Sequence, residues 1–154
     1  MQNQIKTETR LAFIQFIFSS LFSEKSIDDK ITDFEDYFYK LSVSSIYQKK
    51  DTEINYNKNY FKKLTLNYKE FLKKNDVGNT INLLIKFNRK FESWDFINKS
   101  IILSILSELE ITKKEKVKIL LNDYFNISKS LISKKELAMI NAITDKYVNE
   151  KNII

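Results

Sequence analysis

The chain has 154 residues and a formal net charge of +6, with one glycine and no proline, cysteine or histidine. The missing cysteine and histidine exclude disulfides, Cys/His zinc sites and histidine-based acid–base catalysis. Hydrophobic residues make up 43% of the chain, enough for the core of one domain. Because glycine and proline supply most tight turns of β-hairpins, their near absence predicts an all-α fold.

The first predicted helix spans residues 7–23. Apolar side chains recur at helical spacing on one face, at Leu11, Ile14, Phe18, Leu21 and Phe22. Further apolar residues widen this face, which predicts a helix packed between two groups of helices. The segment is shorter than the ~20 residues that span a bilayer, and no signal-peptide cleavage site follows it. We therefore expect a cytoplasmic protein.

Two more helices are predicted before the middle of the chain. Ser26 is followed by two aspartates, a typical helix start, and the helix extends to about residue 41. Residues 43–56 are polar and mixed, which predicts a long loop. The next helix covers residues 58–74. The acids at 28–36 are expected to be solvated charges, because nothing around them suggests a pocket or a ligand set.

Residues 75–79 read Asn-Asp-Val-Gly-Asn and form the clearest predicted turn. Gly78 is expected to end the preceding helix in a left-handed conformation. A fourth helix should then run from Ile81 to near Trp94.

The last third of the chain predicts three amphipathic helices with short polar turns. The segments 112–115 (Thr-Lys-Lys-Glu) and 133–136 (Ser-Lys-Lys-Glu) each match a capping box, so they mark the starts of the last two helices. Apolar residues then follow at steps of three and four. They are Val117, Leu120, Leu121, Tyr124, Ile127 and Leu131, then Leu137, Ile140, Ile143 and Tyr147.

This last third resembles the C-terminal half of the NusB family of bacterial transcription antitermination factors. Residues 101–109 (IILSILSEL) resemble ILRLALYEL, residues 118–131 (KILLNDYFNISKSL) resemble KVAINEAIELAKSF, and residues 139–146 (MINAITDK) resemble FVNGVLDK. The three blocks align without gaps. Earlier in the chain, residues 60–64 (YFKKL) resemble the stretch YFREL. Arg10 and Gln15 match two positions of the first-helix pattern R-E-x-A-x-Q-x-L-Y/F.

The resemblance implies one NusB-like all-α domain over residues 1–154. About seven helices would form two three-helix sub-bundles, roughly 1–75 and 76–154, that share the core of the first helix. It implies a non-catalytic factor without cofactor or metal. Such a factor binds boxA-type single-stranded RNA together with the small-subunit ribosomal protein NusE in the transcription elongation complex. It thereby supports transcription of ribosomal RNA operons.

The resemblance also implies site residues. The RNA-binding set is Lys6, Arg10, Gln15, Phe18, Lys129, Lys134 and Lys135. Cations in this set would neutralise phosphates, and Gln15 would hydrogen-bond the RNA. Asn98 and Lys99 would contact the NusE partner. Because the family's arginine-rich arm is reduced here to Lys6 and Arg10, we expect weak RNA binding that tightens when NusE joins.

Three alternatives stay open at this stage. The lysines, including those at 113–118, are also explained as solubilising charges of a protein from an AT-rich genome. The chain could be a helical protein-interaction domain that has kept the fold and lost RNA affinity. It could also be the accessory domain of an RNA methyltransferase, since some of these enzymes carry a NusB-like domain.

Overall fold

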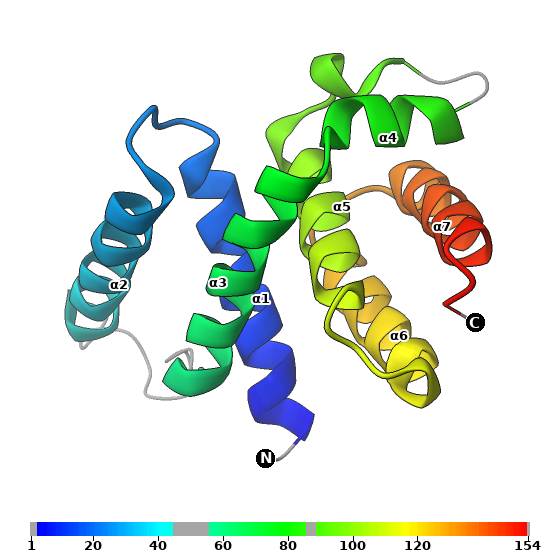
Figure 1. The fold of residues 1–154 in the computed structure, drawn as a ribbon. Coiled ribbons are helices and arrows are strands. Elements are labelled where there is room, and N and C mark those ends of the chain that lie inside the picture. The colour runs from blue at the N-terminus through cyan, green and yellow to red at the C-terminus, as the bar shows by residue number, and fades with distance from the viewer. Residues whose placement is uncertain (1–2, 45–55, 86–88, 154) are drawn as a thin grey trace.

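The structure is a computed structural model. It describes residues 3–44, 56–85 and 89–153, with the backbone alone for residues 37–44. Within these ranges the chain forms helices and no strand, which confirms the all-α prediction (Figure 1). The elements in chain order are α1 (Asn3–Ser20), α2 (Ile27–Ser44), α3 (Lys58–Lys74), α4 (Val77–Leu84), η3 (Phe91–Ser93), α5 (Phe96–Leu109), η4 (Lys114–Lys116), α6 (Val117–Ser128) and α7 (Lys134–Glu150).

Helix α1 lies between two groups of helices, as its wide apolar surface predicted. It packs against α2 and α3 on one side and against α5 and α6 on the other (Figure 1). Phe16 shows how the first group is held, because its ring packs edge-on against Phe34 and Phe61. Helix α7 packs against α5 and α6, and α4 lies on α7.

Helix α5 is the central element of the second group. Every residue from Ser100 to Leu109 is buried, because apolar side chains surround this helix and neighbours cover it on all sides. Burying the serines of α5 costs little folding free energy, because their hydroxyls donate to backbone carbonyls of the preceding turn. Ser104, for example, donates to the carbonyl of Ile101 at 2.7 Å.

Gly78 does not end a helix. It lies in the first turn of α4, which begins after the N-cap residue Asp76, and no glycine in the described residues has a positive φ. A Cβ atom at Gly78 would stand 2.9 Å from Glu92 Oε1, so this position instead allows α4 to lie close to η3. The prediction of a left-handed terminator here was wrong.

The predicted fourth helix is shorter than its sequence suggested. Helix α4 ends at Leu84, and the short helix η3 replaces the stretch expected to continue to Trp94. The side chain of Asn82 joins the two elements. Its Oδ1 accepts from the backbone N–H of Phe91 at 2.8 Å, and its Nδ2 donates to the Glu92 carboxylate at 3.1 Å.

Of the two predicted capping boxes, one is confirmed. Ser133 and Glu136 exchange side-chain to backbone hydrogen bonds at the start of α7. Thr112 makes no such cap, because its hydroxyl donates to the carbonyl of Glu108 at 2.6 Å and so satisfies the end of α5. The chain then passes through η4 before α6 begins at Val117.

The predicted stripe of α6 is only partly buried. Leu120 and Tyr124 lie in the core, whereas Leu121 is half-buried and Leu131 is exposed beyond the helix end. Most of the predicted loop 43–56 lies outside the described residues. No helix in the described part of the chain is both long and apolar enough to cross a membrane.

Candidate functional site

Arg10, expected to bind RNA phosphates, instead points into the interior. Its side chain lies between α5 and α6, and the residue is only 8% exposed. Its Nη2 lies 3.0 Å from Glu108 Oε2, and its Nη1 lies 2.6 Å from Asp123 Oδ2. The positive charge of Arg10 is therefore matched by two carboxylates. This corrects the prediction that Arg10 neutralises phosphates.

Two tyrosines complete this buried group, which we call the Arg10 cluster (Arg10, Tyr60, Glu108, Asp123 and Tyr124). The hydroxyls of Tyr60 and Tyr124 both donate to the Glu108 carboxylate. The guanidinium carbon lies 5.8 Å from the Tyr60 ring centre and 5.5 Å from that of Tyr124. The cluster thus joins α1, α3, α5 and α6. Glu108 carried no signal in the sequence beyond its place in the first of the three blocks, residues 101–109.

The pKa values of Arg10, Tyr60 and Tyr124 are all raised in the cluster. Burial alone would lower the pKa of Arg10, but the hydrogen bond and charge of Glu108 outweigh it and raise that pKa. Burial, together with the charge of Glu108, raises the pKa of Tyr60 and of Tyr124. Both phenols therefore stay protonated and keep donating, so the cluster can hold helices together but exposes no reactive group.

The other predicted residues of α1 lie at its two ends. Lys6 is half-buried in the first turns, next to Thr7, whose hydroxyl donates to Asp123 at 2.6 Å. Gln15 and Phe18 are exposed near the other end of the helix. At 1.5 Å per residue, Lys6 and Phe18 lie about 18 Å apart along the axis.

Phe18 begins a row of aromatic side chains that the sequence did not reveal. Phe22 is 66% exposed, because α1 ends at Ser20 and leaves it beyond the helix. The Phe22 ring centre lies 5.1 Å from that of Phe18 and 4.8 Å from that of Phe96. This corrects the prediction that Phe22 packs in the core.

Lys99 extends this row across the first turn of α5. Its Nζ lies 5.3 Å from the ring centre of Phe96 and 5.4 Å from that of Phe91. It also donates to the carbonyl of Glu92 at 3.1 Å. We call these five residues (Phe18, Phe22, Phe91, Phe96 and Lys99) the aromatic row.

Asn98, predicted to contact a protein partner, is buried and holds α5 to α7. Its Nδ2 donates to the Glu136 carboxylate, which also accepts from the backbone N–H of Ser133 at 3.1 Å. The hydrogen bond from Asn98 is the main reason that the pKa of Glu136 is lowered. Asn98 therefore positions the start of α7, and its side chain is not available for direct contact.

The remaining predicted lysines lie around the α6–α7 connection. Lys129, Lys134 and Lys135 are all exposed. Lys134 and Lys135 occupy the first turn of α7, where the helix dipole disfavours cations. Together with that dipole they create a positive region. The contacts Phe22–Phe96 and Asn98–Glu136 place the end of α1 and the start of α7 at the same end of α5. Lys6 lies away from this group.

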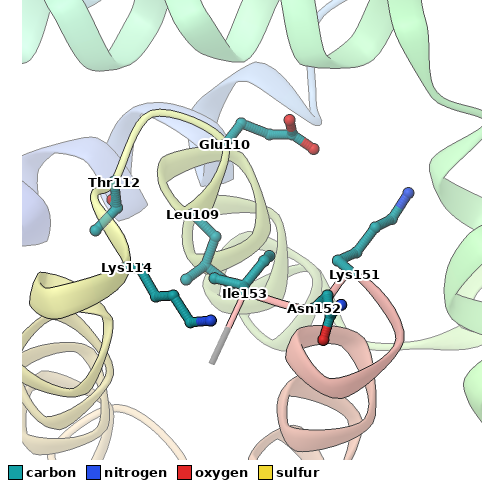
Figure 2. A pocket seen from close by; sticks show the side chains of 7 residues that line it. All are labelled: Leu109, Glu110, Thr112, Lys114, Lys151, Asn152 and Ile153. Atoms are coloured by element: carbon teal, nitrogen blue, oxygen red, sulfur yellow. The ribbon is translucent and has the colours of Figure 1, made fainter.

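A cavity of about 340 Å³ opens beside the α5–α6 connection (Figure 2). Leu109, Glu110, Lys114, Lys151 and Ile153 are among its lining residues. Glu110 already accepts a hydrogen bond from the Tyr147 hydroxyl at 3.1 Å. None of the predicted site residues lines this cavity. Across the described residues, no group of three acidic, cysteine or histidine side chains could hold a metal ion.

Comparisons of the chain with protein-family models, with curated proteins and with solved structures found no match.

Proposed function

We propose that this protein is a NusB-type transcription antitermination factor that binds boxA-type RNA together with a NusE-type ribosomal protein. The observation that carries the proposal is the position of α1. The resemblance implies a first helix shared by two groups of helices, and α1 packs against α2 and α3 on one side and α5 and α6 on the other.

The RNA surface in this proposal lies around the start of α7 and the end of α1. Lys129, Lys134 and Lys135 supply exposed charge for phosphates, and Gln15 and Phe18 supply an exposed amide and ring. Cations at a helix start cost roughly 0.3–1 kcal/mol each in local stability. A role in binding an anion would explain why two lysines occupy these positions.

The partner surface in this proposal is the aromatic row. Phe22 exposes a large apolar side chain next to Phe96 and the cation Lys99. Exposed aromatic anchors of this kind contribute strongly to protein interfaces. The row also contains Phe18, which belongs to the RNA surface, so a bound protein and a bound RNA would lie next to each other there.

Fluorescence anisotropy with labelled boxA-like RNA tests the RNA part of the proposal. We expect weak binding by the protein alone and tighter binding once a NusE-type protein is added. A scrambled RNA of equal length should bind less well. Lys134→Ala with Lys135→Ala should flatten the salt slope by about one to two units, at roughly 0.7 per phosphate contact.

A matched control is Lys73→Ala with Lys74→Ala, which removes the same charge from the end of α3 and should leave RNA binding unchanged. Equal loss in both variants would mean that only net charge matters. No preference for boxA-like over scrambled RNA, with or without the partner, would contradict the proposal.

A second candidate is a protein-interaction domain without RNA affinity. The neutralisation of Arg10 by Glu108 and Asp123 favours it, because α1 then offers only one cation near its start. In that case the aromatic row would still bind a protein partner. Titration with the NusE-type protein would succeed, whereas the RNA titration would show no saturable binding at low salt.

A further inference from the structure

A second basic surface lies at the other end of the molecule from the α6–α7 connection. Seven exposed lysines occupy the first turns of α3, the α5–α6 connection and the start of α6. We call this set the lysine end. Its members are Lys58, Lys62, Lys63, Lys113, Lys114, Lys116 and Lys118.

The lysine end has two parts, one on α3 and one around the α5–α6 connection. Both parts have a neighbour that is hydrogen-bonded to the same residue, Glu108. Tyr60, between Lys58 and Lys62, donates to the Glu108 carboxylate, and Thr112, next to Lys113, donates to the Glu108 carbonyl. Figure 1 shows the starts of α1 and α3 and the α5–α6 connection at the same end of the molecule. Residues about 50 positions apart in sequence therefore lie at the same end of the molecule.

The lysine end carries an excess of positive charge, because Glu115 is the one exposed acid within residues 58–63 and 113–118. Within the described part of the chain none of its seven lysines forms an ion pair, whereas Lys25, Lys69 and Lys73 each pair with an acid elsewhere. The acid Glu108 beneath this surface is buried and already bonded to Arg10. A surface with such an excess of positive charge attracts a polyanion.

We propose that the lysine end binds the phosphodiester backbone of nucleic acid, independently of base sequence. Lysines and polar side chains such as asparagine and threonine are the usual backbone contacts, and Asn59 and Thr112 lie among these lysines. A membrane surface would require apolar side chains alongside the lysines. Among the described residues, three large apolar side chains in or next to these segments are exposed, against seven lysines: Leu66, Ile111 and Ile119.

This surface does not depend on the proposed function, because it shares no residue with the α6–α7 connection or the aromatic row. It gives the protein a second contact with nucleic acid. This contact would add to the affinity of a sequence-specific site elsewhere on the protein. Such a contact should act on any single strand long enough to reach it.

The test compares two triple variants of equal charge. Lys62→Gln, Lys63→Gln and Lys113→Gln remove charge from the lysine end, and Lys25→Gln, Lys73→Gln and Lys74→Gln remove it elsewhere. Anisotropy with uniform U12 RNA and T12 DNA is measured over a series of salt concentrations. We expect the first variant to lose about tenfold in affinity at low salt and to flatten the slope by about two units, with little change in the control.

Several outcomes would overturn the inference. Equal losses in both variants would show an effect of net charge alone. Absence of U12 and T12 binding by the unaltered protein, or binding only to vesicles containing anionic lipid, would exclude a nucleic-acid surface here. Because neither probe contains a boxA-like sequence, these results stay separate from those for Lys134 and Lys135.

Discussion

Arg10 and Glu108 form a buried ion pair in which the guanidinium Nη2 lies 3.0 Å from a carboxylate oxygen, with both side chains under 10% exposed. The two residues are 98 positions apart and belong to α1 and α5, the helices at the centre of the molecule. Because both charges have left water, each depends on the other for its stability.

Removing Arg10 should therefore destabilise the protein strongly. We expect Arg10→Met, which keeps an apolar stem, to lower the free energy of unfolding by about 3–5 kcal/mol, since it leaves Glu108 buried without a cation. Urea denaturation measures this. Lys25→Ala, which breaks the exposed Lys25–Asp33 pair, should change the free energy of unfolding little, because water screens this pair. If Arg10→Met were as stable as the unaltered protein but bound RNA more weakly, the result would instead support a role for Arg10 in binding RNA.

The depth of Leu120 and Leu121 predicts unequal effects of truncation. Leu120 is 1% exposed, so Leu120→Ala should cost about 2–5 kcal/mol through lost burial and a cavity. Leu121 is half-buried at the edge of the same helix, so Leu121→Ala should cost clearly less. Paired denaturant melts compare them, and a larger loss for Leu121 would mean that α6 is rotated about its axis.

The contribution of the α7 capping box to the free energy of unfolding should be measurable with single substitutions at Ser133. Ser133→Ala removes the acceptor for the backbone N–H of Glu136 and should cost about 0.5–2 kcal/mol. Ser133→Asp should retain most of the stability, because a carboxylate caps a helix equally well. Thermal melts of both variants test the pair. Equal loss in the two would indicate that the hydroxyl makes a different contact.

The lowered pKa of Glu136 makes the start of α7 sensitive to acid. A folded-state pKa below the unfolded value means that this contribution to stability is present above the unfolded pKa and is lost as pH falls through the folded value. NMR titration of the Glu136 carboxyl should show the depressed pKa. Asn98→Ala should raise it toward the ordinary value, because the hydrogen bond from Asn98 is its largest cause.

Phe22 should matter for partner binding and little for stability. Since it is 66% exposed, Phe22→Ser removes an exposed ring without leaving a cavity, and the melting temperature should hardly change. Calorimetry should show that affinity for the NusE-type protein falls by tenfold or more if the ring is an interface anchor. Truncation of such an anchor costs about 2 kcal/mol of binding free energy. The control Leu83→Ser removes a side chain that is 79% exposed on α4 and is not part of the aromatic row.

Local features were readable from the sequence because they depend on neighbouring residues. The spacing of apolar side chains predicted α3 over residues 58–74, where the structure has it, and Ser133 with Glu136 predicted the start of α7. The absence of hairpin turn residues predicted the all-α class. The fit of α1 between two groups followed from apolar residues on most of its circumference.

The tertiary structure alone decided what each of these side chains meets. Periodicity shows that a residue faces inward, but it cannot show that Arg10 meets Glu108 and Asp123, which lie 98 and 113 positions away. A helix end is set by competing contacts, so α1 stops at Ser20 and exposes Phe22. Likewise, Gly78 is required where α4 approaches Glu92, a proximity that no local pattern contains.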